Sequence, residues 1–363
     1  MRDHSEMSWL SAETPAGRVC LDPALGNIRR LSFQHGERVI EPLHAAPWIN
    51  EPETDRLPDL IPVERQLSGD FFCAPFGASD VFAAPAHGWT ANSEWVPQET
   101  AQDTLQLTLK RQIQGATFTK TLRIAPDAPL LYQEHLIAGG EGLLTVAHHP
   151  MVNVESGARF STSPKRAVLA ATTALEEGRN ALLAGARSAT LDLAGVNGPV
   201  DLTQLPIAQA HEDFVTLIEA KSSPLGWSAI LRPMQDDVVF ILKDPRKLPV
   251  TMLWHSNGGR DYAPWNGRHT GILGIEDGCA AGEAGHRASL SDNPVAREGV
   301  PTALTLAPTT VHRIAHVIGA VPRPKGWQTV ADITLENDHL MLTGDTHTTL
   351  TLPFVAGFFS EKR

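Results

Sequence analysis

The sequence has few cysteines, no cluster of basic residues and no long apolar run. Its three cysteines, Cys20, Cys73 and Cys279, lie far apart and form no CxxC spacing. A disulfide framework and a zinc ribbon are therefore excluded, and reduced thiols are expected. The formal net charge is -11 and no Lys/Arg cluster is present. Nucleic acid and anionic membranes are thus not expected as partners.

Targeting and cofactor signals are also missing. Residues 1–11 are polar and lack the apolar core of a signal peptide. No apolar run approaches the ~20 residues that span a bilayer. Nucleotide-binding and zinc motifs are absent as well. These absences predict a cytoplasmic protein that needs no cofactor and no metal.

Helical periodicity is nearly absent, whereas alternation with a period of two is frequent. Residues Thr104–Lys110 alternate strictly, and Thr117–Ile124 follow after Gln114-Gly115, which predicts a hairpin. The segment Ala167–Ala186, rich in Ala and Leu, is the candidate helix. Further strands are expected at residues 130–137, 143–148, 214–219, 227–231, 238–242, 250–255, 271–276, 310–318, 332–335, 340–342 and 348–352.

The domain organisation follows from these strands. The chain contains 29 Gly and 27 Pro, which mark many tight turns, and it shows no repeat and no linker. We expect an all-β fold, a large antiparallel β-sandwich that forms one domain over residues 1–363. Residues 323–363 are expected to add strands at the C-terminal edge.

A first candidate for chemistry is the segment Pro85–Trp89. Gly88 allows a tight turn that presents the imidazole of His87 to a cleft. Trp89 offers a flat apolar surface, which suits the C–H faces of a sugar. The alternative is a loop that holds a capped histidine and a core tryptophan.

A second candidate is the pair His148-His149, which closes an apolar strand just before Pro150. Adjacent side chains on a strand point to opposite faces, so only one of the two faces a given cleft. A histidine at a strand end suits a general acid or base. A pair of surface histidines is the equally good alternative.

A third candidate is the strand Gly271–Gly278, which ends in two carboxylates, Glu276 and Asp277. If Glu276 faces the core, it must be paired or functional, because an unpaired buried carboxylate is costly. The alternative is an acidic pair that initiates a turn.

The run from Trp254 to His269 mixes aromatic, basic and amide side chains with small or rigid residues. This density predicts a binding loop for a polyhydroxylated ligand, with Arg260 or Arg268 available for an anionic group. A solvent loop with internal ion pairs is the alternative. The candidate ligand-binding residues in this run are Trp254, His255, Asn257, Arg260, Trp265 and Arg268.

Together these segments resemble a known family. The segment Gly69–Gly77 leads to His87-Gly88-Trp89, then to His149-Pro150 with Asn153, then to Asp213-Phe214, and last to Gly274-Ile275-Glu276. In this order they are similar to the aldose 1-epimerase (galactose mutarotase-like) family, from Leu21 to Val321. The resemblance implies a large antiparallel β-supersandwich.

The resemblance also implies roles for single residues. His149 matches the general acid that protonates the sugar ring oxygen, and Glu276 matches the base that takes the anomeric hydroxyl proton. His87 matches a substrate-binding histidine. Asp213 matches an aspartate that binds sugar hydroxyls, and Glu212 competes for that place.

The chain departs from the family around its first histidine and after its second. Ala78, Ser79, Ala91 and Asn92 stand near the first histidine, where many relatives carry an Arg. Met151-Val152 replace the usual aromatic pair. These differences leave the identity of the sugar open.

The resulting prediction is an isomerase that interconverts the α and β anomers of a monosaccharide, or of an anionic sugar derivative, by acid–base ring opening. The alternatives are a non-catalytic carbohydrate-binding protein and another carbohydrate isomerase or lyase on the same scaffold. A metal site made of His87, His149 and His255 has no supporting spacing. A homodimer is compatible with these predictions.

Overall fold

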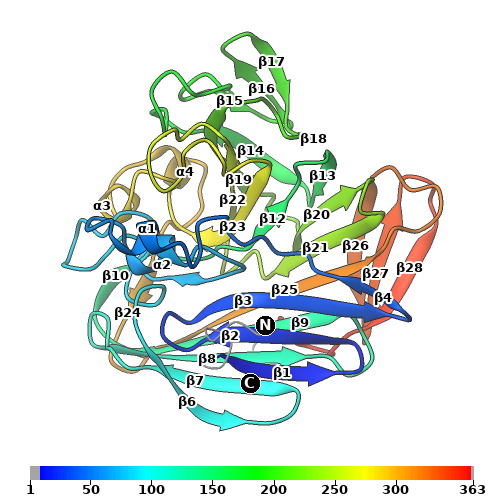
Figure 1. Cartoon of the computed structure of the whole chain (residues 1–363), viewed down its shortest axis with the longest axis horizontal. Helices are drawn as coiled ribbons and strands as arrows, with labels where there is room; N and C mark the ends of the chain where they lie inside the picture. Colours follow the sequence, from blue (N-terminus) through cyan, green and yellow to red (C-terminus); the bar gives the residue numbers. More distant parts are fainter. Residues whose placement is uncertain (1–8, 361–363) are drawn as a thin grey trace.

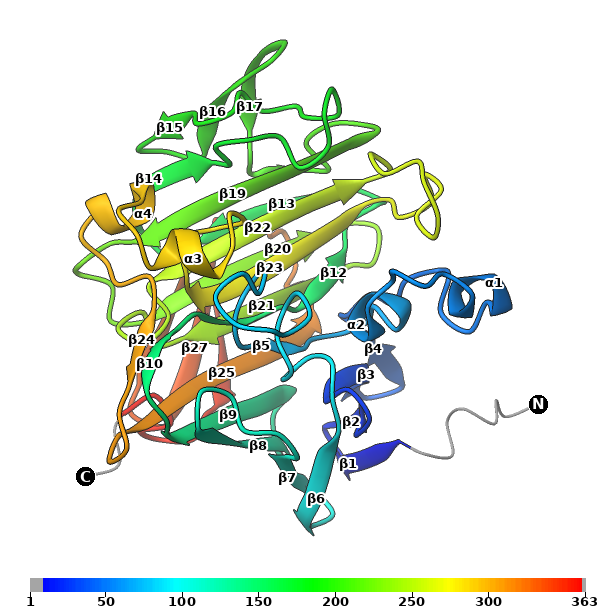
Figure 2. The same ribbon diagram turned by 90° about the vertical axis from the view of Figure 1, so that its left-hand side faces the viewer.

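Two large antiparallel sheets face each other in the computed structural model, which describes residues 9–360 (Figures 1 and 2). The first sheet has eight strands, and one of them, β12 (Met151–Asn153), pairs with β23 (Ile272–Cys279) off the main path. Its main path is β15 (Arg187–Ser188), β14 (Lys165–Ala170), β19 (His211–Glu219), β22 (Val250–Asn257), β23 (Ile272–Cys279), β11 (Val146–His148) and β5 (Phe72–Cys73).

The second sheet has nine strands. Their order is β18 (Gln204–Leu205), β13 (Ala158–Thr162), β20 (Gly226–Arg232), β21 (Asp237–Lys243), β25 (Val311–Pro322), β9 (Leu130–Gly139), β8 (Ala116–Ile124), β7 (Thr104–Leu109) and β6 (Trp95–Thr100).

Smaller elements surround the two sheets. One four-stranded sheet is N-terminal, one three-stranded sheet is C-terminal, and four short helices lie on the first sheet's side of the molecule (Figures 1 and 2). The N-terminal sheet contains β1 (Leu10–Thr14), β2 (Gly17–Asp22), β3 (Asn27–His35) and β4 (Arg38–Ile40), and the C-terminal sheet contains β26 (Val330–Glu336), β27 (His339–Gly344) and β28 (Thr349–Pro353). Two further strand pairs are β10 (Gly142–Leu144) with β24 (Leu304–Leu306) and β16 (Asp192–Gly195) with β17 (Gly198–Asp201). The helices are α1 (Pro52–Asp55), α2 (Pro62–Arg65), α3 (His286–Ser289) and α4 (Pro294–Arg297).

The alternating pattern explains the strands that the sequence predicted. In β7 every second residue is buried, and Thr104 to Thr108 pair with Arg123 to Thr119 of β8, so the predicted hairpin is confirmed. The strands β19, β22 and β23 are buried along their whole length. They are therefore covered on both faces, which fits their continuous apolar runs.

The predicted helix at Ala167–Ala186 is wrong. Its first four residues end β14, where Val168 pairs with Leu217 of β19, and the rest forms turns and loops. The Ala and Leu content favours a helix locally, but pairing with a buried strand decides the conformation.

The core lies in three layers. One apolar cluster fills the space between the two sheets and includes Ile275 and Leu253 of the first sheet. A second cluster lies on the outer face of the first sheet, around Met252 and Trp254. The C-terminal strands pack through Trp327 on the outer face of the nine-stranded sheet. The outer face of the first sheet is where the candidate site lies.

No helix in residues 9–360 has the length and apolar character required to cross a membrane. The polar segment on which the expectation of no signal peptide rests falls largely in residues 1–8, outside the described residues.

Candidate active site

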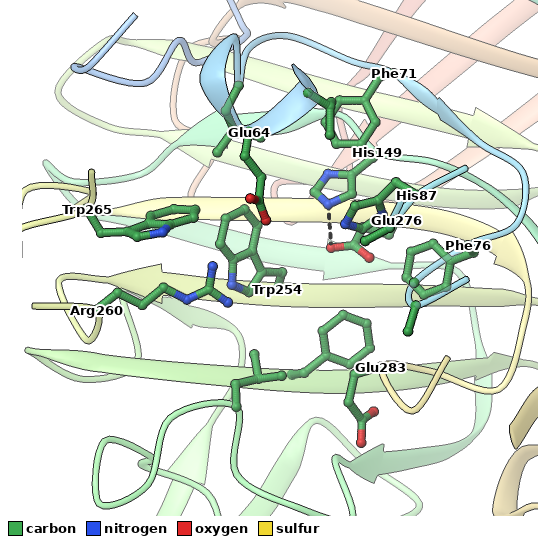
Figure 3. Close-up of a pocket in the computed structure, with 17 residues that line it drawn as sticks. Glu64, Phe71, Phe76, His87, His149, Trp254, Arg260, Trp265, Glu276 and Glu283 are labelled. Atoms are coloured by element: carbon green, nitrogen blue, oxygen red, sulfur yellow. Dashed lines mark ion pairs between the residues drawn. The ribbon is translucent and has the colours of Figure 1, made fainter. Parts of the chain in front are cut away.

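A pocket of about 240 Å3 opens on the outer face of the first sheet (Figure 3). Its floor comes from strands β19, β22 and β23, and its cover comes from α2 and the segment that follows it. The lining residues that carry polar groups or aromatic rings are Glu64, Phe71, Phe76, His87, His149, Phe214, Trp254, Arg260, Trp265, Glu276 and Glu283.

The two residues expected to act as acid and base meet at the floor of this pocket. His149 follows the last residue of β11, and Glu276 lies within β23. Their Nε2 and Oε1 atoms are 3.1 Å apart, and only 4% and 2% of the two residues is exposed (Figure 3). An imidazole and a carboxyl group at this distance can share a proton.

Apolar and aromatic groups surround this pair. The ring of Phe71 stacks on His149 with centroids 4.5 Å apart, and Trp254 meets it edge-on at 5.8 Å. Gly274 lies two residues before Glu276 on β23, and a Cβ atom there would lie 3.1 Å from Oε1 of Glu276 and 3.2 Å from Cβ of Trp254. Glycine thus lets the side chains of Glu276 and Trp254 pack closely over the strand.

Burial governs the protonation of the pair. It raises the pKa of Glu276 well above its ordinary value. Burial, reinforced by His87, lowers the pKa of His149 to about 3. Both shifts disfavour the charged forms and favour a neutral carboxyl group beside a neutral imidazole.

His87 completes this end of the pocket, with its ring 5.5 Å from that of His149. His87 and Gly88 both have positive φ, 63° and 71°, and a Cβ on Gly88 would overlap the carbonyl oxygen of Ala74. The glycine is therefore needed for the turn that the sequence predicted. Burial lowers the pKa of His87 to about 4 and raises that of Cys73, whose Sγ lies 3.4 Å from Nδ1 of His87.

The other end of the pocket is built around Arg260. Its guanidinium carbon lies 4.4 Å from the ring centre of Trp265 and 5.4 Å from that of Trp254. Its Nε is 3.1 Å from Oε1 of Glu176 and 3.9 Å from Oε2 of Glu212. Glu212 also accepts hydrogen bonds from Trp254 Nε1 and Ser256 Oγ, at 2.9 and 2.8 Å. The cation is therefore matched by protein carboxylates before any ligand enters.

The opposite face of the same strands carries an ionic network. Asp70 accepts a hydrogen bond from the backbone N–H of His149 at 2.8 Å, and its second oxygen is 3.1 Å from Nδ1 of His148. Asp277 lies 2.9 Å from Nζ of Lys243 and 3.1 Å from Nε2 of His316. These groups lie between the two sheets, directly behind the pocket pair.

Charge partners set the pKa values in this network. Burial opposes ionisation of Asp70, but His148 and its other partners outweigh burial and lower its pKa to about 2. The pKa of Asp277 is also lowered, because Lys243 and His316 outweigh burial. Both carboxylates are ionised and fully partnered, which is typical of a structural network.

This network includes the group of potential metal ligands found within residues 9–360, namely Asp70, His148 and His316, whose donor atoms lie within 4.8 Å of one another. The two imidazole rings are stacked with centroids 4.0 Å apart and an angle of 6°. An imidazole nitrogen binds a metal in the plane of its ring, and two parallel planes cannot contain the same ion. The geometry therefore suits hydrogen bonding better than metal coordination.

The choice between His148 and His149, which the sequence left to the family resemblance, is visible in the structure. His149 lines the pocket, whereas His148 points between the sheets toward Asp70. Of the other expected ligand-binding residues, the pocket lining contains His87, Trp254, Arg260 and Trp265.

Five expected ligand-binding residues do not line this pocket. Trp89 packs on the inter-sheet core beneath Arg111. Asp213 accepts hydrogen bonds from the backbone of Ala181 and Leu182 and contacts His211 at 2.6 Å, and the ring of His255 lies near His211. Asn257 bonds to the backbone of Ala208 and Gly271, and Arg268 bonds to both carboxylate oxygens of Glu51 at 2.6 Å.

Other lining residues had no assigned role in the sequence. Phe71 and Phe76 belong to the Gly69–Gly77 segment, which the family pattern did contain. Phe214 follows Asp213 on strand β19, so its side chain points to the opposite face of the sheet, where the pocket lies. Glu64 and Glu283 come from short helical or loop segments with no distinctive sequence pattern.

Comparisons with known proteins support the fold. No family model and no curated protein matches the chain. Among solved structures, a protein of Escherichia coli K12 described provisionally as an aldose 1-epimerase is 14% identical, with a TM-score of 0.58 over 86% of this chain and 98% of its own. A galactose mutarotase related enzyme of Lactobacillus acidophilus is 13% identical, with a TM-score of 0.56 over 87% and 98%. A galactose mutarotase-like protein of Lactobacillus casei is 9% identical, with a TM-score of 0.56 over 86% and 100%.

The fold is therefore galactose mutarotase-like, and the predicted antiparallel β-supersandwich is confirmed. The resemblance seen in the ordered motifs is confirmed at the level of structural neighbours, which are aldose 1-epimerase and galactose mutarotase-like proteins.

Proposed function

We propose that this protein is an isomerase that interconverts the α and β anomers of a neutral monosaccharide. The observation that carries the proposal is the 3.1 Å contact between His149 and Glu276 at the floor of an aromatic pocket. The galactose mutarotase-like fold supports it, although a fold alone does not decide an activity.

The chemistry requires one base and one acid at the same carbon. The hydroxyl oxygen O1 and the ring oxygen O5 of a cyclic sugar are both bonded to C1. Ring opening removes the proton of O1, forms the C1=O double bond, breaks the C1–O5 bond and adds a proton to O5. Because the two oxygens share one carbon, an acid and a base that touch each other can reach both.

The shared proton lets His149 and Glu276 fill these roles. The resemblance gives the proton to His149, which delivers it to O5 while Glu276 takes the proton of O1. Burial by itself favours this proton on Glu276 instead. The two forms differ by a proton transfer along one contact. After rotation about C1–C2, reclosure runs the same transfers in reverse and returns the pair to its starting state.

The charges around the pocket favour a neutral sugar over an anionic one. Among the described residues Arg260 is the one cation that lines it, together with the carboxyl groups of Glu64 and Glu283. Arg260 already has Glu176 and Glu212 close to it, and Arg268 is paired with Glu51. A carboxylate or phosphate on the sugar would add a negative charge to a site whose cation is already matched.

The remaining polar and aromatic groups hold the sugar in place. Trp254 offers its ring to a C–H face of the sugar between the acid–base pair and Arg260 (Figure 3). His87, neutral at pH 7, exchanges hydrogen bonds with a hydroxyl group next to C1. The cytoplasm is the proposed location of the protein.

Nuclear magnetic resonance saturation transfer between the two anomers tests this proposal. The panel contains glucose, galactose, glucuronate and glucose 6-phosphate. We expect faster exchange for at least one neutral sugar, little for the anionic ones, and loss of the effect in Glu276→Gln.

Glu283→Gln is the matched control, because Glu283 lines the same pocket without belonging to the pair. Unaccelerated exchange of every sugar by a folded protein would contradict the proposal. It would favour a non-catalytic carbohydrate-binding protein or another carbohydrate reaction instead.

A further inference from the structure

A second cavity adjoins the pocket on the side away from His149 and Glu276. It has a volume of about 420 Å3, larger than that of the inner pocket. We call it the outer groove. Its lining residues are Leu57, Pro58, Asp59, Leu60, Glu64, Arg260, Tyr262, Ala263 and Trp265.

The outer groove and the inner pocket share three residues, Glu64, Arg260 and Trp265. Figure 3 shows these three together at one end of the inner pocket, with His87 and Glu276 at the other and Trp254 between them. The shared residues therefore form the boundary between two adjoining cavities.

We infer that the outer groove is a binding subsite for a second sugar unit, so that the favoured substrate is a neutral reducing disaccharide. This inference rests on the proposed function for the orientation of the reacting ring. C1 of that ring lies at His149 and Glu276. In a pyranose chair C4 lies opposite C1, so a substituent on C4 points toward Glu64, Arg260 and Trp265.

The chemistry of the outer groove suits a sugar ring. Tyr262 is 50% exposed and presents an aromatic ring, while Leu57 and Leu60 supply apolar surface for C–H groups. Asp59 and Glu64 offer hydrogen-bond acceptors for hydroxyl groups, and no cation besides Arg260 lines the described part of the groove. This composition favours a neutral, polyhydroxylated unit.

The aromatic wall of the groove is held in position before any ligand enters. The hydroxyl of Tyr262 donates a hydrogen bond to Oε1 of Glu176 at 2.7 Å, and its carbonyl accepts one from the backbone of Asn266 at 2.8 Å. Trp265 packs edge-on against Trp48 with centroids 4.6 Å apart. A preorganised wall loses little freedom on binding, which increases its contribution to affinity.

The test compares glucose with cellobiose and maltose, two disaccharides of glucose linked through O4. Calorimetry gives the affinity of each sugar, and saturation transfer gives kcat/KM for exchange at the reducing end. We expect cellobiose or maltose to exceed glucose by about tenfold in both quantities, because remote contacts add binding energy.

Two substitutions outside the inner pocket test whether the outer groove is the source of this gain in affinity and kcat/KM. Tyr262→Ala removes the aromatic wall, and Ala263→Trp fills the groove. Both are expected to bring the disaccharide down to the level of glucose and to leave glucose unchanged. Tyr262→Phe keeps the ring and is expected to keep most of the gain.

The outcomes separate the two proposals. Equal affinities for glucose and the disaccharides, or a gain in affinity that survives Ala263→Trp, would overturn the proposed subsite. If the protein still accelerates the exchange of glucose anomers in that case, the proposed function is upheld. A tighter disaccharide that Tyr262→Ala weakens, without exchange of any sugar, would uphold the subsite and overturn the proposed function.

Discussion

The two faces of strands β11 and β23 carry similar residues in opposite circumstances. On the outer face His149 and Glu276 form a pair in an aromatic pocket, and burial drives both toward their neutral forms. On the inner face their chain neighbours His148 and Asp277 belong to a network in which the carboxylates are ionised. The two sets of groups differ in their charge partners. The groups on the inner face have such partners and are structural, whereas the pair on the outer face lacks them and can transfer protons.

The largest expected effect separates the two histidines. His149→Asn removes one member of the proton-transferring pair, and we expect the anomer exchange rate to fall about 10²–10⁴-fold. His148→Asn should leave that rate within about threefold of the wild type, because the side chain lies behind the strand, and should instead lower stability by about 1–3 kcal/mol. Saturation-transfer rates and urea unfolding of both variants check this, and equal losses of rate would break the comparison.

The next effect concerns the network. Asp277 faces Lys243 at 2.9 Å and accepts a hydrogen bond from Thr251 at 2.7 Å, with all three buried. Asp277→Asn leaves the buried ammonium group with less negative charge nearby, and we expect a loss of about 3–5 kcal/mol in the free energy of unfolding.

Glu276→Gln is the matched control for stability. It replaces a neutral carboxyl group by a neutral amide, so its cost in urea unfolding should be far smaller. A smaller loss in Asp277→Asn than in Glu276→Gln would contradict the assignment of the inner face.

A third prediction concerns pH. Burial lowers the pKa of five histidines to about 3 or about 4, namely His44, His87, His148, His149 and His255. Each has a pKa near 6.5 when unfolded, so the unfolded chain binds more protons between these values. The stability present above pH 6.5 is therefore lost as the pH falls toward about 4, at up to about 1.4 kcal/mol per pH unit for each histidine.

Urea unfolding at several pH values between 7.5 and 4.5 measures this slope. We expect His149→Asn to reduce the slope of the unfolding free energy against pH by the contribution of one histidine. A slope that does not change with this variant would show that the imidazole of His149 is protonated in the folded protein.

The smallest expected effect concerns the support of His87. Burial keeps the thiol of Cys73 protonated, so it can donate to Nδ1 of His87 and leave the proton of that ring on Nε2. We expect Cys73→Ala to raise KM a few-fold with little change in kcat, and Cys73→Ser to restore most of the loss. An unchanged KM in Cys73→Ala would remove Cys73 from the site's support.

The sequence predicted the strands well where alternation or continuous apolar runs were long, as in β7, β8 and β19 to β23. It missed β16 and β17, a local hairpin whose strands of four residues each are too short to show alternation. The helix expected at Ala167–Ala186 was wrong because local propensity yields to pairing with a buried strand.

For the site, the chain order of the motifs identified His87, His149 and Glu276, which the fold brings together. Alternation along a strand also places the side chains of Trp254 and His255 on opposite faces of the sheet, and likewise those of Phe214 and Asp213. Glu64 and the outer groove come from packing of distant segments, and no local pattern predicts them.

The most direct test of the account compares the two adjacent carboxylates, Glu276 and Asp277, in one assay. The anomer exchange rate of the best neutral sugar is measured for Glu276→Gln and Asp277→Asn at equal concentrations of folded protein. The account predicts a loss of at least about 100-fold for Glu276→Gln and a rate near that of the wild type for Asp277→Asn. Retained exchange in Glu276→Gln, or a comparable loss in both, would contradict it.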